Sequence, residues 1–275
     1  MNKYTLFDNI VEKEKAYSFI VSAKELLNML GIKAPSLGES KQDIGAEGKA
    51  LNSEAFHYNN AFNLARAKKE DAKIICVEDC SYNSFAQTKE ALLEDEVLKE
   101  KISSKLKRDG LELSLDTAVL HVNEVIKDVI GLLEFKKMVK KSFANFNIAV
   151  FKGNQNSDDT INESILNILG ANIVSFDAQL KSDGYEILSA SKELADKLAG
   201  KVMLDTFDNG ADLVIANDVR SFMMFDGRQK NLECSVGRDI NLAILSISQI
   251  ALMALGCDDK SKIGLESHKV QATLL

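Results

Sequence analysis

Apolar residues along the chain follow two spacings, one typical of buried strands and the other of amphipathic helices. Short β-rich runs at 4–7 and 147–151 each precede a polar loop and then a helical pattern, at 15–31 and 162–170. In these helical stretches apolar residues recur every three or four positions, and each stretch ends at a glycine that suits a left-handed cap. The pattern predicts two units that begin in the same way.

Later elements also occur in pairs. Strand signals follow the first helices, and then come longer helical patterns, buried strand runs and a closing strand with one more amphipathic helix. The paired segments are 32–37 with 171–177, 53–69 with 189–209, and 73–77 with 212–216. Because strands and helices alternate, we expect an α/β fold with mainly parallel sheets flanked by helices.

Short segments of the first half return in the second. LNMLG at 27–31 reappears as LNILG at 166–170, and VLHVNEVIKDVIG at 119–131 returns in the same apolar register as ILSISQIALMALG at 244–256. We therefore predict a tandem of duplicated α/β units related by a pseudo-twofold axis. The predicted halves are 1–144 and 145–275.

The spacing between equivalent segments changes once along the chain. It is 139 residues for the glycines that end the first helices and 125 for the glycines near the end of each half. The first half therefore carries about fifteen extra residues, within 90–110. Their mixed charge and regular Leu and Ile spacing predict an added, exposed helix.

Composition excludes several classes of protein. A net charge of −7 argues against a general nucleic-acid binder, which needs a basic face. No apolar run is long enough to span a bilayer, and the N-terminus lacks a signal-peptide core, so we expect a cytoplasmic protein without membrane insertion. The four cysteines show no CxxC spacing and are expected to be free thiols.

Candidate site residues occupy the loops that follow the predicted strands. Carboxyl ends of parallel strands meet at one edge of a sheet, and duplication places two such edges on either side of a seam. The candidates at this seam are Asp43, Gly45, Glu78, Ser81, Asn154, Asp183, Gly184, Asp218 and Ser221.

The order of these loops, with NIAVFKGN, NGADLVIAND and the ending GLESHKV, resembles the heterodisulfide reductase B-subunit family, also called the CCG or cysteine-rich domain family. The resemblance runs end to end and is most specific from about 210 to 270. It implies iron–sulfur clusters bound in each half by a Cys after the first strand, a Cys-Cys-Gly loop and a Cys-x-x-Cys loop.

Other residues stand at those family positions in this chain. Asn154 replaces the first-strand Cys of the second half, 182–184 replaces its Cys-Cys-Gly loop, and Asp218 with Ser221 replaces its Cys-x-x-Cys loop. In the first half, 43–45 and Glu78 with Ser81 take the matching places. An iron–sulfur cluster needs about four thiolates, and hard oxygen ligands do not replace them. We therefore expect a relative that has no cluster and no other cofactor.

Two interpretations of the acidic loop residues stay open. Asp43, Glu78, Asp183 and Asp218 either cap the helices that follow them or converge to bind a hard cation such as Mg²⁺ or Ca²⁺. Cys80, near a helix start, is a candidate reactive thiol with a lowered pKa.

The favoured function is a non-catalytic accessory subunit that docks on a redox or respiratory complex. The alternative is an enzyme or binding protein that uses the seam for a small ligand or a hard cation. The third interpretation is an iron–sulfur electron-transfer subunit. The sequence leaves the oligomeric state open.

Overall fold

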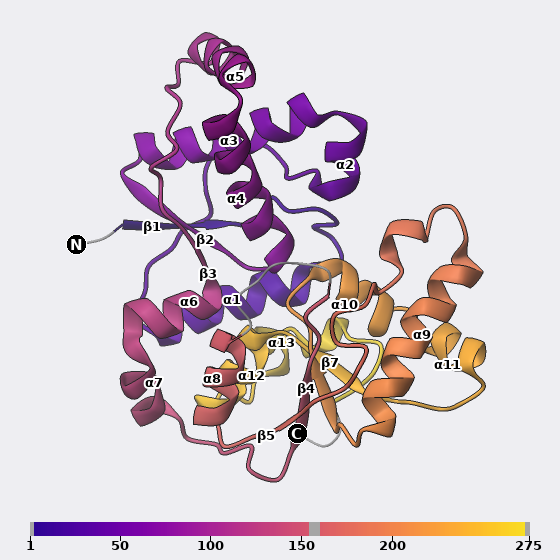
Figure 1. Ribbon diagram of the computed structural model, residues 1–275. Coiled ribbons are helices and arrows are strands. Elements are labelled where there is room, and N and C mark those ends of the chain that lie inside the picture. Colours follow the sequence, from indigo (N-terminus) through magenta and orange to yellow (C-terminus); the bar gives the residue numbers. More distant parts are fainter. Residues whose placement is uncertain (1–2, 154–159, 273–275) are drawn as a thin grey trace.

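The computed structural model describes residues 3–153 and 160–272 and contains two parallel sheets (Figure 1). The first has the order β1-β2-β3, and the second has the order β5-β4-β6-β7. The strands are β1 (Lys3–Phe7), β2 (Ala72–Cys76), β3 (Val119–His121), β4 (Asn147–Val150), β5 (Asn172–Val174), β6 (Leu213–Ile215) and β7 (Ala243–Leu245). The predicted α/β class is confirmed, and two sheets are consistent with duplicated units.

The predicted strand at 32–37 is wrong. Only Ser36 forms a β-bridge, with Leu6, at the sheet edge that corresponds to β5 in the second half. The Leu6 amide donates to the Pro35 carbonyl at 2.8 Å, and the Leu37 amide donates to the Leu6 carbonyl at 2.8 Å. Proline has no amide hydrogen to extend a ladder, so pairing stops after this one bridge.

Helices cover both sheets. In the first half they are α1 (Tyr17–Met29), α2 (Gly45–Leu51), α3 (Ser53–Lys69), α4 (Asp79–Glu94), α5 (Glu96–Arg108), α6 (Val122–Glu124), the π-helix η1 (Val125–Gly131) and α7 (Leu132–Met138). In the second half they are α8 (Thr160–Ile168), η2 (Tyr185–Ile187), α9 (Lys192–Asp208), α10 (Val219–Phe225), α11 (Gln229–Val236), α12 (Ile247–Ala254), α13 (Lys260–Ile263) and η3 (Leu265–Ser267). Gly31 and Gly170, which follow α1 and α8, have the positive φ predicted for caps, +73° and +81°.

The first helix of each half packs against the last helices of the other half. Helix α1 of the first half packs on α12 and α13 of the second, and α8 of the second packs on α6 and α7 of the first. Asn123 of α6 donates a hydrogen bond to Asn162 of α8 at 2.9 Å. One continuous apolar core therefore joins both sheets. The boundary near 144 remains a prediction.

The inserted segment forms a helix with its own small core. Helix α5 packs on α3 and α4 through the buried Ile102 and Leu106, separately from the main core. Its N-terminus is capped by Asp95, which accepts a hydrogen bond from the Leu98 amide at 3.0 Å. Across 3–153 and 160–272, no helix combines the length and apolarity needed to cross a membrane.

Candidate functional site

Two carboxylates begin equivalent helices on either side of the seam. Glu78 accepts hydrogen bonds from the amides of Cys80 and Ser81 at 2.8 and 2.7 Å at the start of α4. Asp218 accepts from the amides of Arg220 and Ser221 at 2.8 and 3.3 Å at the start of α10. Both carboxylates satisfy backbone donors that the first turn of a helix leaves free. The capping interpretation is therefore confirmed for this pair.

The glycine loops also match between halves. Asp43 accepts a hydrogen bond from the Gly45 amide at 3.1 Å, and Ser182 accepts one from the Gly184 amide at 3.0 Å. Gly184 has φ +79°, and a Cβ there would lie 2.6 Å from the Ala195 carbonyl oxygen. Only glycine fits both this backbone conformation and this close approach. The predicted equivalence of 43–45 and 182–184 therefore has a structural counterpart.

Asp183 lies beside the start of α10. Its carboxylate accepts a hydrogen bond from the Ser221 hydroxyl at 2.6 Å and another from the Tyr185 amide at 2.9 Å. Burial raises the pKa of Asp183 to about 6, and the Ser221 hydrogen bond opposes that rise. These contacts join the glycine loop to the helix-start loop of the second half.

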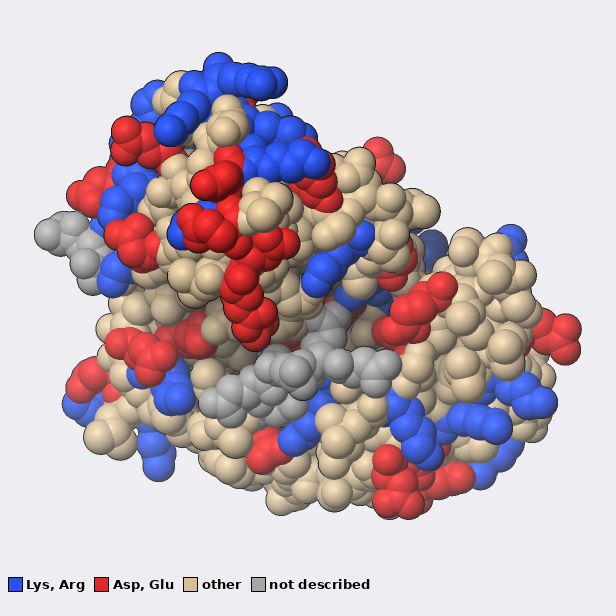
Figure 2. Space-filling view, turned by 45° about the horizontal axis from the view of Figure 1, so that its top comes forward, with Lys and Arg blue, Asp and Glu red and all other residues tan. Residues whose placement is uncertain are grey.

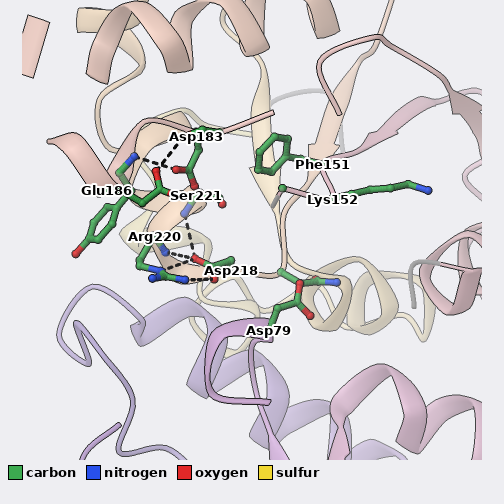
Figure 3. Close-up of a pocket in the computed structure, with 12 residues that line it drawn as sticks. Asp79, Phe151, Lys152, Asp183, Glu186, Asp218, Arg220 and Ser221 are labelled. Carbon is green, nitrogen blue, oxygen red and sulfur yellow. Dashed lines mark hydrogen bonds and ion pairs between the residues drawn. The ribbon is translucent and has the colours of Figure 1, made fainter. Parts of the chain in front are cut away.

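Arg220 connects the two halves and was not among the site residues expected from the sequence. Figure 3 shows its guanidinium beside Asp218, at the start of α10. Its guanidinium donates to Asp218 at 3.2 Å and to both carboxylate oxygens of Glu47, on α2 of the first half, at 3.2 Å. Arg220 is 8% exposed. The only signal in the sequence was the place of Arg220 between Asp218 and Ser221, two of the expected site residues.

The four predicted carboxylates come together in the seam. Asp43, Glu78, Asp183 and Asp218 are all buried. Burial raises the pKa of Asp43 to about 6. Burial also raises the pKa of Glu78, and the charge of Asp218 adds to that shift. The guanidinium of Arg220 balances part of this negative charge, and the raised pKa of Glu78 favours the protonated form of that carboxyl.

The pKa of the Cys80 thiol is shifted in the direction opposite to the one predicted. It is 6% exposed, and burial raises the pKa of its thiol well above the usual value, with the charge of Glu78 adding to the effect. Cys76 is also buried, and its pKa is raised for the same reasons. The expected lowered pKa of Cys80 is therefore wrong, because nearby carboxylates and burial outweigh the position near a helix start.

The seam does not fit an iron–sulfur cluster. Cys76 and Cys80 flank the Glu78 loop, whereas Cys234 lies on α11 and Cys257 lies after α12. All four are free thiols. Two protonated thiols among carboxylates and hydroxyls do not supply the thiolates that a cluster needs. Asn154, the remaining family position, lies outside the described residues.

The ligands in the seam suit a single metal ion better than they suit an iron–sulfur cluster. One ligand atom each from Glu78, Cys80 and Asp218 lies within 4.8 Å of the others. The guanidinium of Arg220, however, already pairs with Asp218, and backbone amides already bind the Glu78 carboxylate. Two of the three ligand groups are therefore already engaged by protein donors.

Two hollows border these residues. A small cavity of about 40 Å³ lies next to Asp183, Asp218 and Ser221 and has room for one or two water molecules. A larger groove of about 730 Å³ lies on the other side of Arg220, along α4, and includes Cys80 in its wall. The larger groove has contributions from both halves.

Comparisons with known proteins agree with this architecture. Residues 185–269 match the family model described as the HdrB-like C-terminal domain, which confirms the resemblance expected from the sequence. The chain is similar to the 8-methylmenaquinol:fumarate reductase membrane anchor subunit of Wolinella succinogenes, at 23% identity over 286 residues that cover 99% of each protein.

A solved structure has the same fold. The crystal structure of a hypothetical protein from Helicobacter pylori aligns with a TM-score of 0.88 and 24% sequence identity. The alignment covers 100% of this chain and 53% of the other, so this chain spans about half the length of that solved protein.

Proposed function

We propose, from the premise that residues 185–269 form an HdrB-like C-terminal domain, that the chain is a subunit of a redox complex and holds no iron–sulfur cluster of its own. The full-length similarity to a subunit of a menaquinol:fumarate reductase supports membership in such an assembly. The absence of a cluster is inferred from the seam, where carboxylates and hydroxyls occupy the family's cysteine positions.

The seam then has a structural role in this proposal. The carboxylates cap helices, the hydroxyl of Ser221 binds Asp183, and Arg220 ties α10 to α2. These contacts fill the space in which relatives are expected to carry a cluster and hold the two halves in a fixed arrangement. A rigid two-lobed protein can present a constant surface to a partner without carrying electrons.

The proposal is tested on tagged full-length chain purified without oxygen from its native cells. We expect co-purification of redox proteins that carry flavin or iron–sulfur groups. After separation from these partners, we expect the chain to contain less than one iron per molecule and no visible absorbance.

Two outcomes contradict the proposal. Stoichiometric iron and a brown colour in the separated chain would contradict the absence of a cluster. A chain that emerges alone, without any redox protein, would contradict membership in a complex. A C76S/C80S variant is the matched control for metal content, because it removes both seam thiols and should leave the iron content and the co-purified proteins unchanged.

The alternative function, binding of a hard cation at Asp43, Glu78, Asp183 and Asp218, has a separate test. A cation that binds the folded protein raises the unfolding temperature, and the rise grows with its excess over the dissociation constant. We expect millimolar Mg²⁺ or Ca²⁺ to leave the unfolding temperature of the wild type unchanged at constant ionic strength. A rise that an E78Q/D218N variant abolishes would instead support the cation site.

A further inference from the structure

The groove beside the seam is lined by one exposed face of α4. Its volume is about 730 Å³, and α4 supplies Asn83, Ala86, Gln87, Glu90, Leu93 and Glu94 to its wall. These positions recur at intervals of three and four residues, as expected for one side of a helix. From 83 to 94 the face is about 17 Å long, at roughly 1.5 Å per residue. The other wall comes from Ala46, Phe56 and the second-half residue Glu186.

The groove has an apolar strip and an acidic rim. Leu93 is 69% exposed, and Ala86 is also exposed on the same helix face. Glu90, Glu94 and Glu186 are exposed carboxylates that line the groove. Within the described part of the chain, Glu90 and Glu94 form no ion pair with a Lys or Arg. Figure 2 shows Asp and Glu side chains gathered on the first half, where it borders the second.

Arg220, which lines the groove, and Lys49, which contacts two of its lining residues, are already engaged. Arg220 in its floor binds Asp218 and Glu47. Lys49 donates a hydrogen bond to Gln87 at 2.8 Å and lies over the Phe56 ring. The rim carboxylates therefore remain available to cations supplied from outside.

We propose that this groove binds an amphipathic, positively charged helical segment of a partner protein. The inference deepens the proposed function and rests on it, since it assigns the surface by which the chain docks. Apolar side chains of the segment pack on the exposed Leu93 and Ala86, and Lys or Arg side chains pair with Glu90, Glu94 and Glu186. A helix laid in a groove contributes apolar anchors at three- and four-residue spacing, and charge complementarity sets its orientation and rate of association.

The size of the groove matches this occupant. The exposed face of α4 has the length of about three helical turns, and a helix with its side chains is about 10 Å wide. The groove runs along one exposed face of α4, whereas small-molecule sites bury most of the ligand. The acidic rim also opposes an acidic peptide.

The first test uses a defined probe. A capped peptide of about 14 residues, with Leu at helical spacing and Lys at the other positions, is titrated into the full chain and followed by fluorescence anisotropy. A peptide with the same Leu residues and Glu in place of Lys is the charge control. We expect the Lys peptide to bind, with weaker binding at higher salt, and the Glu peptide not to bind.

Two variants locate the binding surface. E90K/E94K reverses the charge of two rim residues and should weaken binding of the Lys peptide roughly tenfold or more. D128K/E134K makes the same change of net charge on exposed residues of η1 and α7, away from the groove, and should bind as the wild type does. Equal losses in the two variants, or no loss in E90K/E94K, would overturn the inference.

The co-purification experiment separates this inference from the proposed function. If the wild type retains redox partners and E90K/E94K loses them while D128K/E134K keeps them, the groove is the docking surface. If all three retain the same partners, the groove inference fails and the proposed function stands. Self-association of the chain that E90K/E94K abolishes would assign the groove to a second copy and would also overturn the inference.

Discussion

At the scale of single residues, the seam is governed by the cost of burying charge. Asp43 and Asp183 are buried acids whose pKa values are raised to about 6 by burial. Buried thiols respond in the same direction, so Cys80 is a weak nucleophile despite its position near a helix start. Burial and the surrounding charges therefore set the protonation of these acids and thiols.

Asp43 gives a pH-dependent prediction. Because its folded pKa lies above its ordinary value of 3.8, the folded state holds the proton more tightly, and stability falls as pH rises from about 4 to about 6. The D43N variant does not titrate at this site. We expect the unfolding free energy of the wild type, relative to D43N, to decrease by up to about 3 kcal/mol between pH 4 and pH 7.

The measurement is urea unfolding of both proteins at several pH values. D128N, on an exposed residue, is the control for the change in net charge. A wild-type-minus-D43N difference that stays constant, or that grows with pH, would show that Asp43 is not a buried acid with a raised pKa.

At the scale of elements, corresponding loops of the two sheets have the same local geometry with different side chains. The helix-start carboxylates Glu78 and Asp218 use one capping arrangement. The turns at 43–45 and 182–184 use another, in which a side-chain oxygen accepts from the amide of the glycine two residues later. Local hydrogen bonding therefore preserves the loops although the thiols of the family pattern are absent.

The turn at Gly184 provides a prediction at this scale. Both Gly184 and Gly210 have φ near +80°, but a Cβ at Gly210 meets no atom within 4 Å, whereas one at Gly184 lies 2.6 Å from a backbone oxygen. G210A should cost about 1 kcal/mol from backbone conformation alone. G184A should cost about 2 kcal/mol more, because the loop must also move. Chemical denaturation of both variants measures the difference, and equal losses would contradict the tight packing of this turn.

At the scale of the whole molecule, exchanged helices and a buried cation join the halves. Helices α1 and α8 pack across the seam, and Arg220 pairs with a carboxylate from each half. Breaking one member of a buried ion pair leaves its partners without compensation, and this is costly. The relative position of the halves, and with it the shape of the groove beside α4, depends on these contacts.

The contribution of Arg220 to stability can be compared with that of Arg228, whose ion pair lies within the second half. R220Q leaves Asp218 and Glu47 without their cation and should lower the unfolding free energy by about 3 kcal/mol. R228Q removes a pair with Asp196, at 2.6 Å, that lies wholly in the second half and is more exposed, so its cost should be roughly 1 kcal/mol. Urea unfolding of both variants measures the two losses of unfolding free energy. An R220Q variant as stable as R228Q would mean that the seam does not depend on this cation.

Much of the fold was predictable because it depends on local patterns. The helix at 53–69 and the strands at 4–7 and 73–77 were expected at nearly their observed bounds. The conformation of 32–37 was not predicted correctly, because Pro35 interrupts the strand that the apolar pattern favoured. Helices α2 and α11, each only seven or eight residues long, were not expected from the sequence.

The sequence by itself determined the parallel α/β class, the glycine turns and the scarcity of thiols at the family's cysteine positions, because each follows from spacing or residue type. It also predicted a tandem, with which the two parallel sheets are consistent. Only the tertiary structure decided the chemistry of the seam. Arg220 and Glu47 are 173 residues apart, and no local pattern shows that they meet. The raised pKa values of Asp43 and Cys80 likewise come from burial between the halves, which depends on how the two lobes pack.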